Sequence, residues 1–188
     1  MLKFLCLTTM SLVMLSCDRV TTWSNNNPGP GLNLVEASND GLVQDSKTPA
    51  GLFTLPDAIR ILGEPAHLSD SSTTTNAGIL TYRCSFTANS KDEKSGKTGV
   101  VYLLFEHYNQ VDSAKKKYTF IKTANKDHGI TVLHDLGDEA YFHTDKTNFY
   151  FVMARKGRKV FNMKVNKITS STSLDEFNKV AKQITDAL

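Results

Sequence analysis

The chain has 188 residues, of which 40% are hydrophobic, and its 22 basic and 19 acidic side chains give a formal charge of +3 at pH 7. This composition is typical of soluble globular proteins and excludes the disordered, collagenous and multi-spanning membrane classes. Three cysteines are too few for a disulfide scaffold, and the net charge is too small for a dedicated nucleic-acid binder. We therefore expect one ordinary folded domain that binds no nucleic acid.

The N-terminus has the layout of a secretory signal. Lys3 precedes a segment, 4–15, that is mostly apolar, and the small residue Ser16 stands before Cys17. A helix of this length rises about 18 Å, whereas the hydrocarbon core of a bilayer is roughly 30 Å thick, so the segment is too short for a permanent transmembrane anchor. We expect residues 1–16 to be a signal peptide that is removed.

The sequence Met14-Leu15-Ser16-Cys17 resembles a bacterial lipobox, at which a peptidase cuts before a cysteine whose thiol carries a diacylglycerol. The resemblance implies that Cys17 is the lipid-attachment site and that the bilayer is a partner of the chain through this acylated residue. Each buried acyl CH₂ contributes about 0.8 kcal/mol, so two or three chains anchor a protein firmly. It also implies a location in the bacterial cell envelope, in either the inner or the outer membrane. An ordinary secretory signal with an incidental cysteine is the alternative.

Residues 17–51 have the composition of a linker. They are rich in Asn, Gly, Pro, Ser and Asp, and they show no sustained periodicity. If flexible, about thirty such residues span roughly 30 Å, enough to hold a domain clear of the lipid headgroups. We therefore expect a lipidated N-terminus and tether over 17–51 and a single folded domain over 52–188.

The folded part is predicted to begin with a short helix. Thr54 is placed as its N-cap, Pro56 lies in the first turn where a missing N–H costs nothing, and Gly63 ends it. We expect an apolar stripe that includes Ala58, Ile59 and Leu62.

Two strands are predicted next. Strict alternation over 79–88 indicates a strand with one wet face, and it places Cys84 on the apolar face, where we expect a buried and unreactive thiol. Residues 99–108 are apolar on both faces, which is typical of a strand in the middle of a sheet.

The second half of the chain is predicted to return to the sheet after a helix that opens near Asn109. Short strands are expected over 130–134 and 140–143, and alternating apolar residues on both sides of Gly157 predict a hairpin. Ser173 and Glu176 have the spacing of a capping box that opens the last helix.

This element order, αββα-β(β)ββ-α, predicts an α+β fold. Strand pairs joined by short turns favour a largely antiparallel sheet, and amphipathic helices are expected to cover it. We expect about five or six strands in this α/β sandwich.

The basic residues of the predicted hairpin limit how far its two strands can pair. Pairing Phe151 with Met163 centres the hairpin on Gly157 and sets Arg155 opposite Lys159, and like charges in that position repel. We therefore expect the strands to end earlier and a five-residue tip to project its cationic side chains into solvent.

This tip is the candidate partner-binding site. Residues 146–167 hold seven basic and no acidic residues, so the positive charge of the chain is concentrated there. An envelope protein, an envelope polymer or an anionic headgroup is the kind of partner that such a surface suits. The alternative is a solvated hairpin that only resists edge-to-edge pairing. The four proposed contact residues are Arg155, Lys156, Arg158 and Lys159.

A polar string between the second helix and the hairpin contains metal-ligand residue types. The string consists of His128, His134, Asp135, Asp138, Glu139 and His143. Its spacings match no metal motif, and the sequence has no nucleophile elbow, phosphate loop or dinucleotide fingerprint. We expect a protein that is not an enzyme and holds no cofactor. The alternative is an extracytoplasmic hydrolase or metal-binding protein that uses His128, His134, Asp138 and His143.

Aromatic residues give a third candidate site. The run Phe149-Tyr150-Phe151 places rings on both faces of the hairpin, and the second strand of the domain does the same with Tyr102 and Phe105. Rings beneath helices are expected in the core, whereas a ring on an uncovered face lines a ligand groove. A small-ligand carrier, with an apolar pocket between helices and sheet, is therefore a further alternative.

Two short segments carry a family resemblance. Ile61-Leu62-Gly63-Glu64-Pro65 and Leu136-Gly137-Asp138-Glu139-Ala140-Tyr141, followed by a hairpin and a helix, resemble bacterial lipoprotein domains related to the PsbP-like α/β sandwich, over roughly 52–188. The resemblance implies an accessory or binding protein without catalytic residues. We therefore expect a membrane-anchored envelope lipoprotein of non-enzymatic binding or accessory type.

Overall fold

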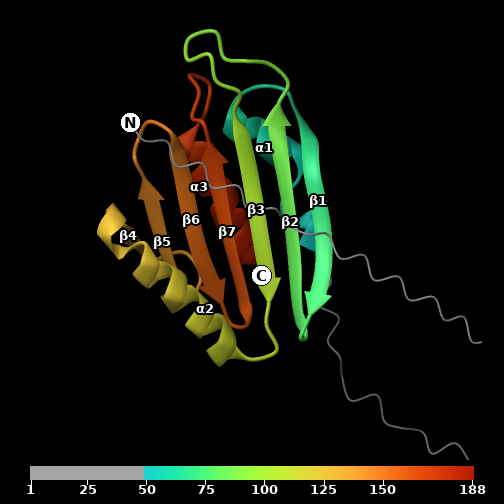
Figure 1. Ribbon diagram of the computed structural model, residues 1–188, viewed down its shortest axis with the longest axis vertical. Coiled ribbons are helices and arrows are strands. Elements are labelled where there is room, and N and C mark those ends of the chain that lie inside the picture. The colour runs from blue at the N-terminus through green and yellow to red at the C-terminus, as the bar shows by residue number, and fades with distance from the viewer. Residues whose placement is uncertain (1–48) are drawn as a thin grey trace, which may run out of the picture. The chain divides into compact units, whose positions relative to one another are not determined.

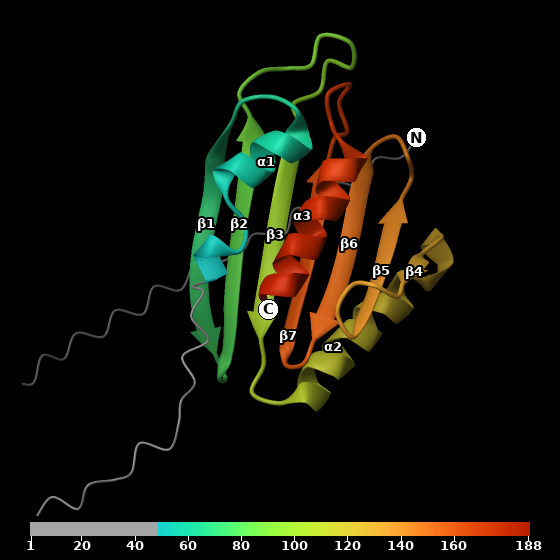
Figure 2. The same ribbon diagram turned by 180° about the vertical axis from the view of Figure 1, so that it is seen from behind.

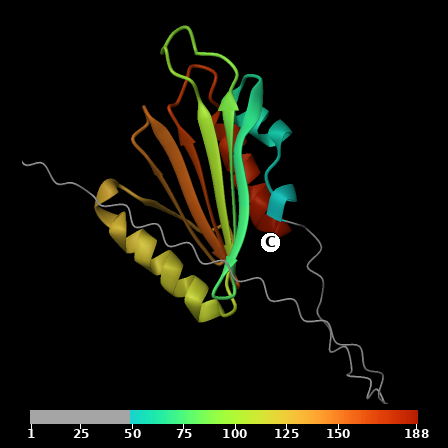
Figure 3. The same ribbon diagram turned by 45° about the vertical axis from the view of Figure 1, so that its right-hand side comes forward.

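The structure is a computed structural model that describes residues 49–188, apart from the side chain of His128. The predicted signal peptide, Cys17 and almost all of the predicted tether lie outside the described residues. Seven strands form one open sheet (Figures 1 and 2). Helices α1 and α3 cover one side of this sheet and α2 lies on the other, so that the described residues form three layers (Figure 3).

The sheet is antiparallel throughout, with the strand order β1-β2-β3-β7-β6-β5-β4. Its strands are β1 (Ala66–Asn76), β2 (Ile79–Ala88), β3 (Val100–His107), β4 (Thr131–Leu133), β5 (Glu139–Thr144), β6 (Phe149–Lys156) and β7 (Lys159–Asn166). The helices are α1 (Leu55–Leu62), α2 (Val111–Ala124) and α3 (Leu174–Ala187), with short 3₁₀ turns η1 (Pro49–Gly51) and η2 (Lys126–His128).

The predicted α+β class is confirmed, but the expected strand number and order are wrong. The additional strand is β1, which the sequence conceals because its run of polar residues shows no apolar alternation and its Ser, Asp and Asn residues do not favour strands. It forms because a two-residue turn after Asn76 folds the chain back onto β2, with which it pairs along its whole length. Three strands therefore stand between α1 and α2, where two were expected.

The core has two parts, one on each side of the sheet. The larger part lies under α1 and α3, and the smaller part lies under α2, where Tyr118 meets Tyr141 of β5 and Met153 of β6. Strand β3 contributes alternate residues to the larger part, among them Val101 and Leu103. The residues between them face the side on which α2 lies.

The helix ends follow the predicted chemistry. Gly63 closes α1 with φ +71°, and the Oγ of Ser173 accepts a hydrogen bond of 3.2 Å from the Glu176 N–H at the start of α3. The predicted apolar stripe of α1 is wrong at Ile59, which is 37% exposed; Ile61 is buried in its place.

The β6–β7 hairpin is confirmed, and its predicted register is wrong by one residue. Val152, rather than Phe151, stands opposite Met163, and Lys156 stands opposite Lys159. The turn has only two residues, and Gly157 at its first position has φ +56°, as a type II′ turn requires. A shift of one residue exchanges the two faces of a strand, so Phe151 points toward the α2 side.

Candidate functional site

The buried cation of the hairpin is Arg155. Its side chain is 8% exposed, its Nε donates a hydrogen bond of 2.6 Å to Glu139 and its Nη1 donates one of 2.8 Å to Asp138. Both carboxylates belong to the segment that enters β5, which pairs with β6. Arg155 therefore fixes two adjacent strands and does not project into solvent.

The two hairpin lysines contact the end of α3. Lys156 Nζ donates to the carbonyl oxygen of Thr185 at 3.1 Å, and Lys159 Nζ donates to that of Leu188 at 2.9 Å. A helix C-terminus carries partial negative charge, so these contacts stabilise α3. Of the four predicted contact residues, Arg158 alone is exposed, while Lys156 and Lys159 are half-buried and Arg155 is buried.

The expected five-residue cationic tip is therefore wrong. The two-residue turn keeps the flanking cations within the strands, where the carboxylates and helix carbonyls attract them. The alternative interpretation, a hairpin that protects a sheet edge, is wrong as well, because β6 and β7 are interior strands and form no edge of the sheet.

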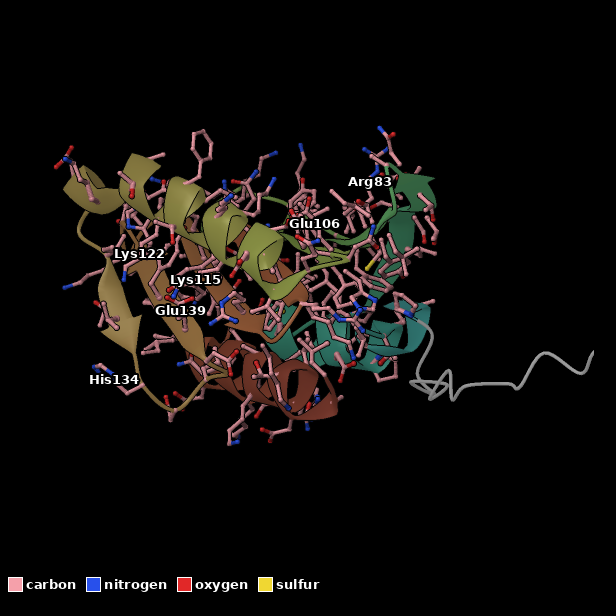
Figure 4. The ribbon with its side chains drawn as sticks, turned by 90° about the horizontal axis from the view of Figure 1, so that it is seen from below. Arg83, Glu106, Lys115, Lys122, His134 and Glu139 are labelled. Atoms are coloured by element: carbon pink, nitrogen blue, oxygen red, sulfur yellow. The ribbon has the colours of Figure 1, made fainter. Side chains whose placement is uncertain are left out.

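The polar string does not gather into a metal site in the described part of the chain. Within residues 49–188, apart from the His128 side chain, no group of three His, Cys, Asp or Glu side chains is placed to hold a metal ion. His134 is exposed beside β4 (Figure 4), and Asp138 binds Arg155. The His143 ring packs at a tilt against the Phe149 ring, with ring centroids 4.9 Å apart.

The side of the sheet on which α2 lies is only partly covered by that helix. α2 packs on β6 and β7, while Arg83 and Glu106 lie on the same side of the sheet beyond it (Figure 4). Among the described residues no helix packs over this side of β1 and β2. We call this surface the open face and define it by Asp70, Ser72, Arg83, Tyr102 and Lys164, together with Ser85, which is buried between its neighbours.

A continuous row of side chains crosses the open face. The strand pairing sets Ser85 of β2 opposite Tyr102 of β3, and Tyr102 opposite Lys164 of β7. Asp70 of β1 extends the row at one end and Phe151 of β6 at the other. Paired residues project from the same face of a sheet, so these five side chains stand side by side.

The Tyr102 ring is the exposed aromatic centre of this row. It is 40% exposed although its strand is interior to the sheet, because it faces the side on which α2 lies and that helix packs on β6 and β7 instead. Lys164, directly across from it, holds its Nζ 5.4 Å from the centroid of the Phe149 ring. The prediction that residues 99–108 form a strand in the middle of the sheet is confirmed, since β3 lies between β2 and β7.

Arg83 supplies the second cation of the open face. Its Nε donates to Ser72 Oγ at 2.8 Å and lies 3.5 Å from Asp70 Oδ2, and all three side chains stand at the surface. An exposed ion pair contributes about 0–1 kcal/mol, so Arg83 can exchange Asp70 for an anionic ligand at little cost.

Hydroxyl groups fill the rest of the surface toward β1. Ser69 Oγ lies 2.9 Å from Ser85 Oγ and accepts a hydrogen bond of 2.9 Å from Thr87. The open face thus combines one exposed aromatic ring, two cations, one carboxylate that is paired with Arg83, and a cluster of hydroxyls. Such a surface offers stacking, charge pairing and hydrogen bonding to one extended ligand.

An ion pair marks the border between the open face and α2. Lys117 Nζ of α2 lies 3.6 Å from Glu106 Oε1 of β3. Burial, with Glu106 nearby, raises the pKa of Tyr108, so this phenol stays neutral at ordinary pH. The pair fixes α2 over its half of the sheet and leaves the other half open.

The expected burial of Cys84 is confirmed. Its thiol lies in the core on β2, and burial raises the pKa of this thiol. The open face therefore contains no thiol.

An apolar cleft of about 390 Å³ lies elsewhere, between α3 and strands β4–β6. Phe142 and Val152 form part of its wall, and Lys179 and Lys182 stand at its rim. Both lysines are already paired on α3, with Glu176 and Asp186.

The sequence pointed to the hairpin as the charged candidate site and did not identify the open face. Two sequence features belong to the open face: the polar side of β2, with Arg83 and Ser85, and the aromatic residue Tyr102 on β3. The missing information was β1 and the side of the sheet on which α2 packs.

Within residues 49–188, no helix combines the length and the apolar character needed to cross a bilayer. Comparison with protein-family models, curated proteins and solved structures found no match to the chain.

Proposed function

We propose that the chain is a lipid-anchored protein of the bacterial cell envelope, of non-enzymatic binding or accessory type. In this proposal Cys17 carries the lipid, residues 17–51 supply the tether, and the folded domain binds a partner through its open face. The grounds for the anchor are the lipobox resemblance and the linker composition that follows it. The partner we propose is an envelope polysaccharide that carries anionic groups.

The observation that carries the choice of ligand is the exposed Tyr102 ring with Lys164 opposite it. A sugar ring presents an apolar C–H face that stacks on an aromatic side chain, and its hydroxyls bond to Ser, Thr and Asn groups. Lys164 and Arg83 are placed to pair with carboxylate or phosphate groups on such a polymer.

The same surface is less suited to a large protein partner. The central part of a protein interface is rich in apolar and aromatic residues and poor in charged ones. Tyr102 is the main exposed ring of the open face, and the other residues that define this face carry hydroxyls, two cations and one carboxylate. A flat polar surface with one exposed ring favours a polymer that lies across the strands.

Replacement of Cys17 with Ser tests the anchor. We expect the variant to lose lipid attachment and to leave the membrane fraction, because serine cannot form the thioether. Fractionation of cells at high salt measures this. A variant that is still processed and still membrane-bound would contradict the anchor without bearing on the open face.

Replacement of Tyr102 with Ala tests the ligand site. The probe is envelope polysaccharide extracted from the producing cells and freed of protein, and the readout is its co-sedimentation with the Cys17→Ser chain. We expect affinity to fall about tenfold, which corresponds to about 1.4 kcal/mol.

Phe120→Ala is the matched control, because Phe120 is a 74% exposed ring on α2 outside the open face. This variant should bind as the unaltered chain does. Equal losses in the two variants, or none in Tyr102→Ala, would refute the assignment.

A second candidate function, small-ligand carriage, is favoured by the cleft beneath α3. Its apolar wall suits a single acyl chain or an aromatic ring. Val152→Trp would fill the cleft, so it should abolish binding of dodecanol, measured by calorimetry, if this candidate is correct. Dodecanol binding that is absent, or that survives the substitution, would exclude it.

A further inference from the structure

The strand at one end of the sheet, β1, is long and open on its outer side. It runs for 11 residues, Ala66–Asn76, and pairs with β2 alone (Figure 1). Within residues 49–188 no strand pairs with its other edge. The opposite end of the sheet is formed by β4, which has only 3 residues, Thr131–Leu133.

From Asp70 to Asn76, β1 lacks the devices that usually protect a sheet edge. Proteins blunt such edges with lysine, proline, shortness or a bulge that twists the strand away. β1 contains no Lys, Arg or Pro, and its one carboxylate, Asp70, is paired with Arg83. A single register shift lies between Leu68 and Asp70, and from Asp70 to Asn76 the pairing with β2 is regular.

We propose that the segment Asp70–Asn76 pairs, antiparallel and edge to edge, with the same segment of a second copy of the chain. The two sheets then join into one continuous sheet through a twofold axis at Thr73. Such an interface is self-complementary, as closed dimers require.

The sequence of the segment fits this register. With the axis at Thr73, Asp70 stands opposite Asn76, so the carboxylate meets an amide and not another carboxylate. The five residues between them, 71–75, all carry hydroxyls, and each meets a hydroxyl of the other copy. Cross-strand pairs of Thr and Ser are favourable, and no like charges are opposed.

The dimer would align the two open faces. The axis of such a pair is perpendicular to the sheet, so the open face of each copy is on the same side. The two β3 strands lie five strand spacings apart, or about 24 Å at about 4.8 Å each. Tyr102 is level with Asp70, which stands six residues from its counterpart in the other copy, so the two rings are also offset by about 20 Å along the strands and stand about 31 Å apart. One polymer could then bind both open faces. This consequence rests on the proposed function, but the proposal of the dimer is independent of it.

The interface is small, and its strength is expected to depend on confinement. Pairing of one strand edge buries less than the roughly 1,200 Å² that is typical of stable complexes, so association in solution should be weak. Attachment of both copies to one membrane would raise their effective concentration.

A cysteine scan tests both the contact and its register. In the full chain with Cys6→Ser and Cys17→Ser, single cysteines are introduced at residues 71–75, and disulfide-linked dimer is measured after mild oxidation. Thr73→Cys should give the most dimer, since two copies of the axial residue come within disulfide reach. Thr131→Cys, on the β4 edge, is the control.

A second variant separates weak pairing from none. Thr73→Lys places two like charges on the axis and should lower dimerisation at least tenfold in sedimentation experiments up to about 1 mM, whereas Thr73→Ser should leave it unchanged. The proposal is overturned if no position in 71–75 exceeds the Thr131→Cys control, or if the chain stays monomeric over this range. An edge occupied by residues 18–48 of the same chain would give that monomeric result. Polysaccharide binding by a monomer would leave the proposed function standing.

Discussion

Substitution of Arg155 by methionine removes the guanidinium that joins β6 to the start of β5. The change keeps an unbranched side chain of similar length, so most of the packing within the sheet is retained. It deletes the 2.6 Å contact with Glu139 and the 2.8 Å contact with Asp138, and it leaves two carboxylates without their common cation.

The expected cost follows from the exposure of those carboxylates. Two hydrogen bonds to charged groups contribute about 3–6 kcal/mol together before solvent is considered. Glu139 is 32% and Asp138 47% exposed, so water replaces part of what the guanidinium supplied. We therefore expect a loss of about 2 kcal/mol in the free energy of unfolding, or about 8 °C in Tm.

Urea denaturation of the Cys17→Ser chain, followed by circular dichroism, measures this loss. Arg158→Met is the matched control, because Arg158 is exposed at the turn of the same hairpin and should change stability by less than about 0.5 kcal/mol. Addition of Glu139→Gln to Arg155→Met should restore part of the loss by removing one of the two unpaired carboxylates. Equal stabilities of Arg155→Met and Arg158→Met would refute the structural role of Arg155.

Three further predictions concern the domain itself. Gly63→Ala should lower the free energy of unfolding, measured by urea denaturation, by about 2 kcal/mol or more, because the added Cβ meets a backbone carbonyl. Gly96→Ala is the control: Gly96 has φ +66° but open space around it, so the loss should be about 1 kcal/mol. Equal losses in the two variants would contradict this prediction. The backbone N–H of Asn148 above all holds the pKa of Asp145 below its usual range. The ionised Asp145 carboxylate therefore stabilises the fold above about pH 4, and this stabilisation is lost as the pH falls. Asp145→Asn should make the free energy of unfolding less dependent on pH in the acid range, and an unchanged pH dependence would argue against this role. Cys84, buried and with a raised pKa, should react with a thiol reagent at pH 8 only when urea unfolds a chain that carries Cys6→Ser and Cys17→Ser; rapid native labelling would contradict its burial.

The elements that the sequence predicts well are those whose pattern is set by local chemistry. β2 alternates strictly and has the expected bounds, and the Ser173 cap opens α3 as its spacing predicts. β1 has no such pattern, because a strand exposed along most of its length has no apolar face. Its existence depends on a partner strand that only the folded chain provides.

The site shows the same division. The positive charge between residues 146 and 167 is visible in the sequence, but its availability is not. The pairing of β5 with β6 places Arg155 beside Glu139 and Asp138, and α3 brings carbonyl groups to the two lysines. Tyr102 is exposed for the opposite reason, since α2 packs on the other half of the sheet.

The most direct test of the proposed binding surface is a residue-level map of ligand contact. The ¹⁵N-labelled Cys17→Ser chain is titrated with oligosaccharides released from the extracted envelope polysaccharide, and amide chemical shifts are followed. We predict that the largest shifts lie at Arg83, Tyr102 and Lys164 on the open face. Shifts that centre on Arg158 or on the cleft beneath α3, or no shifts at saturating ligand, would contradict it.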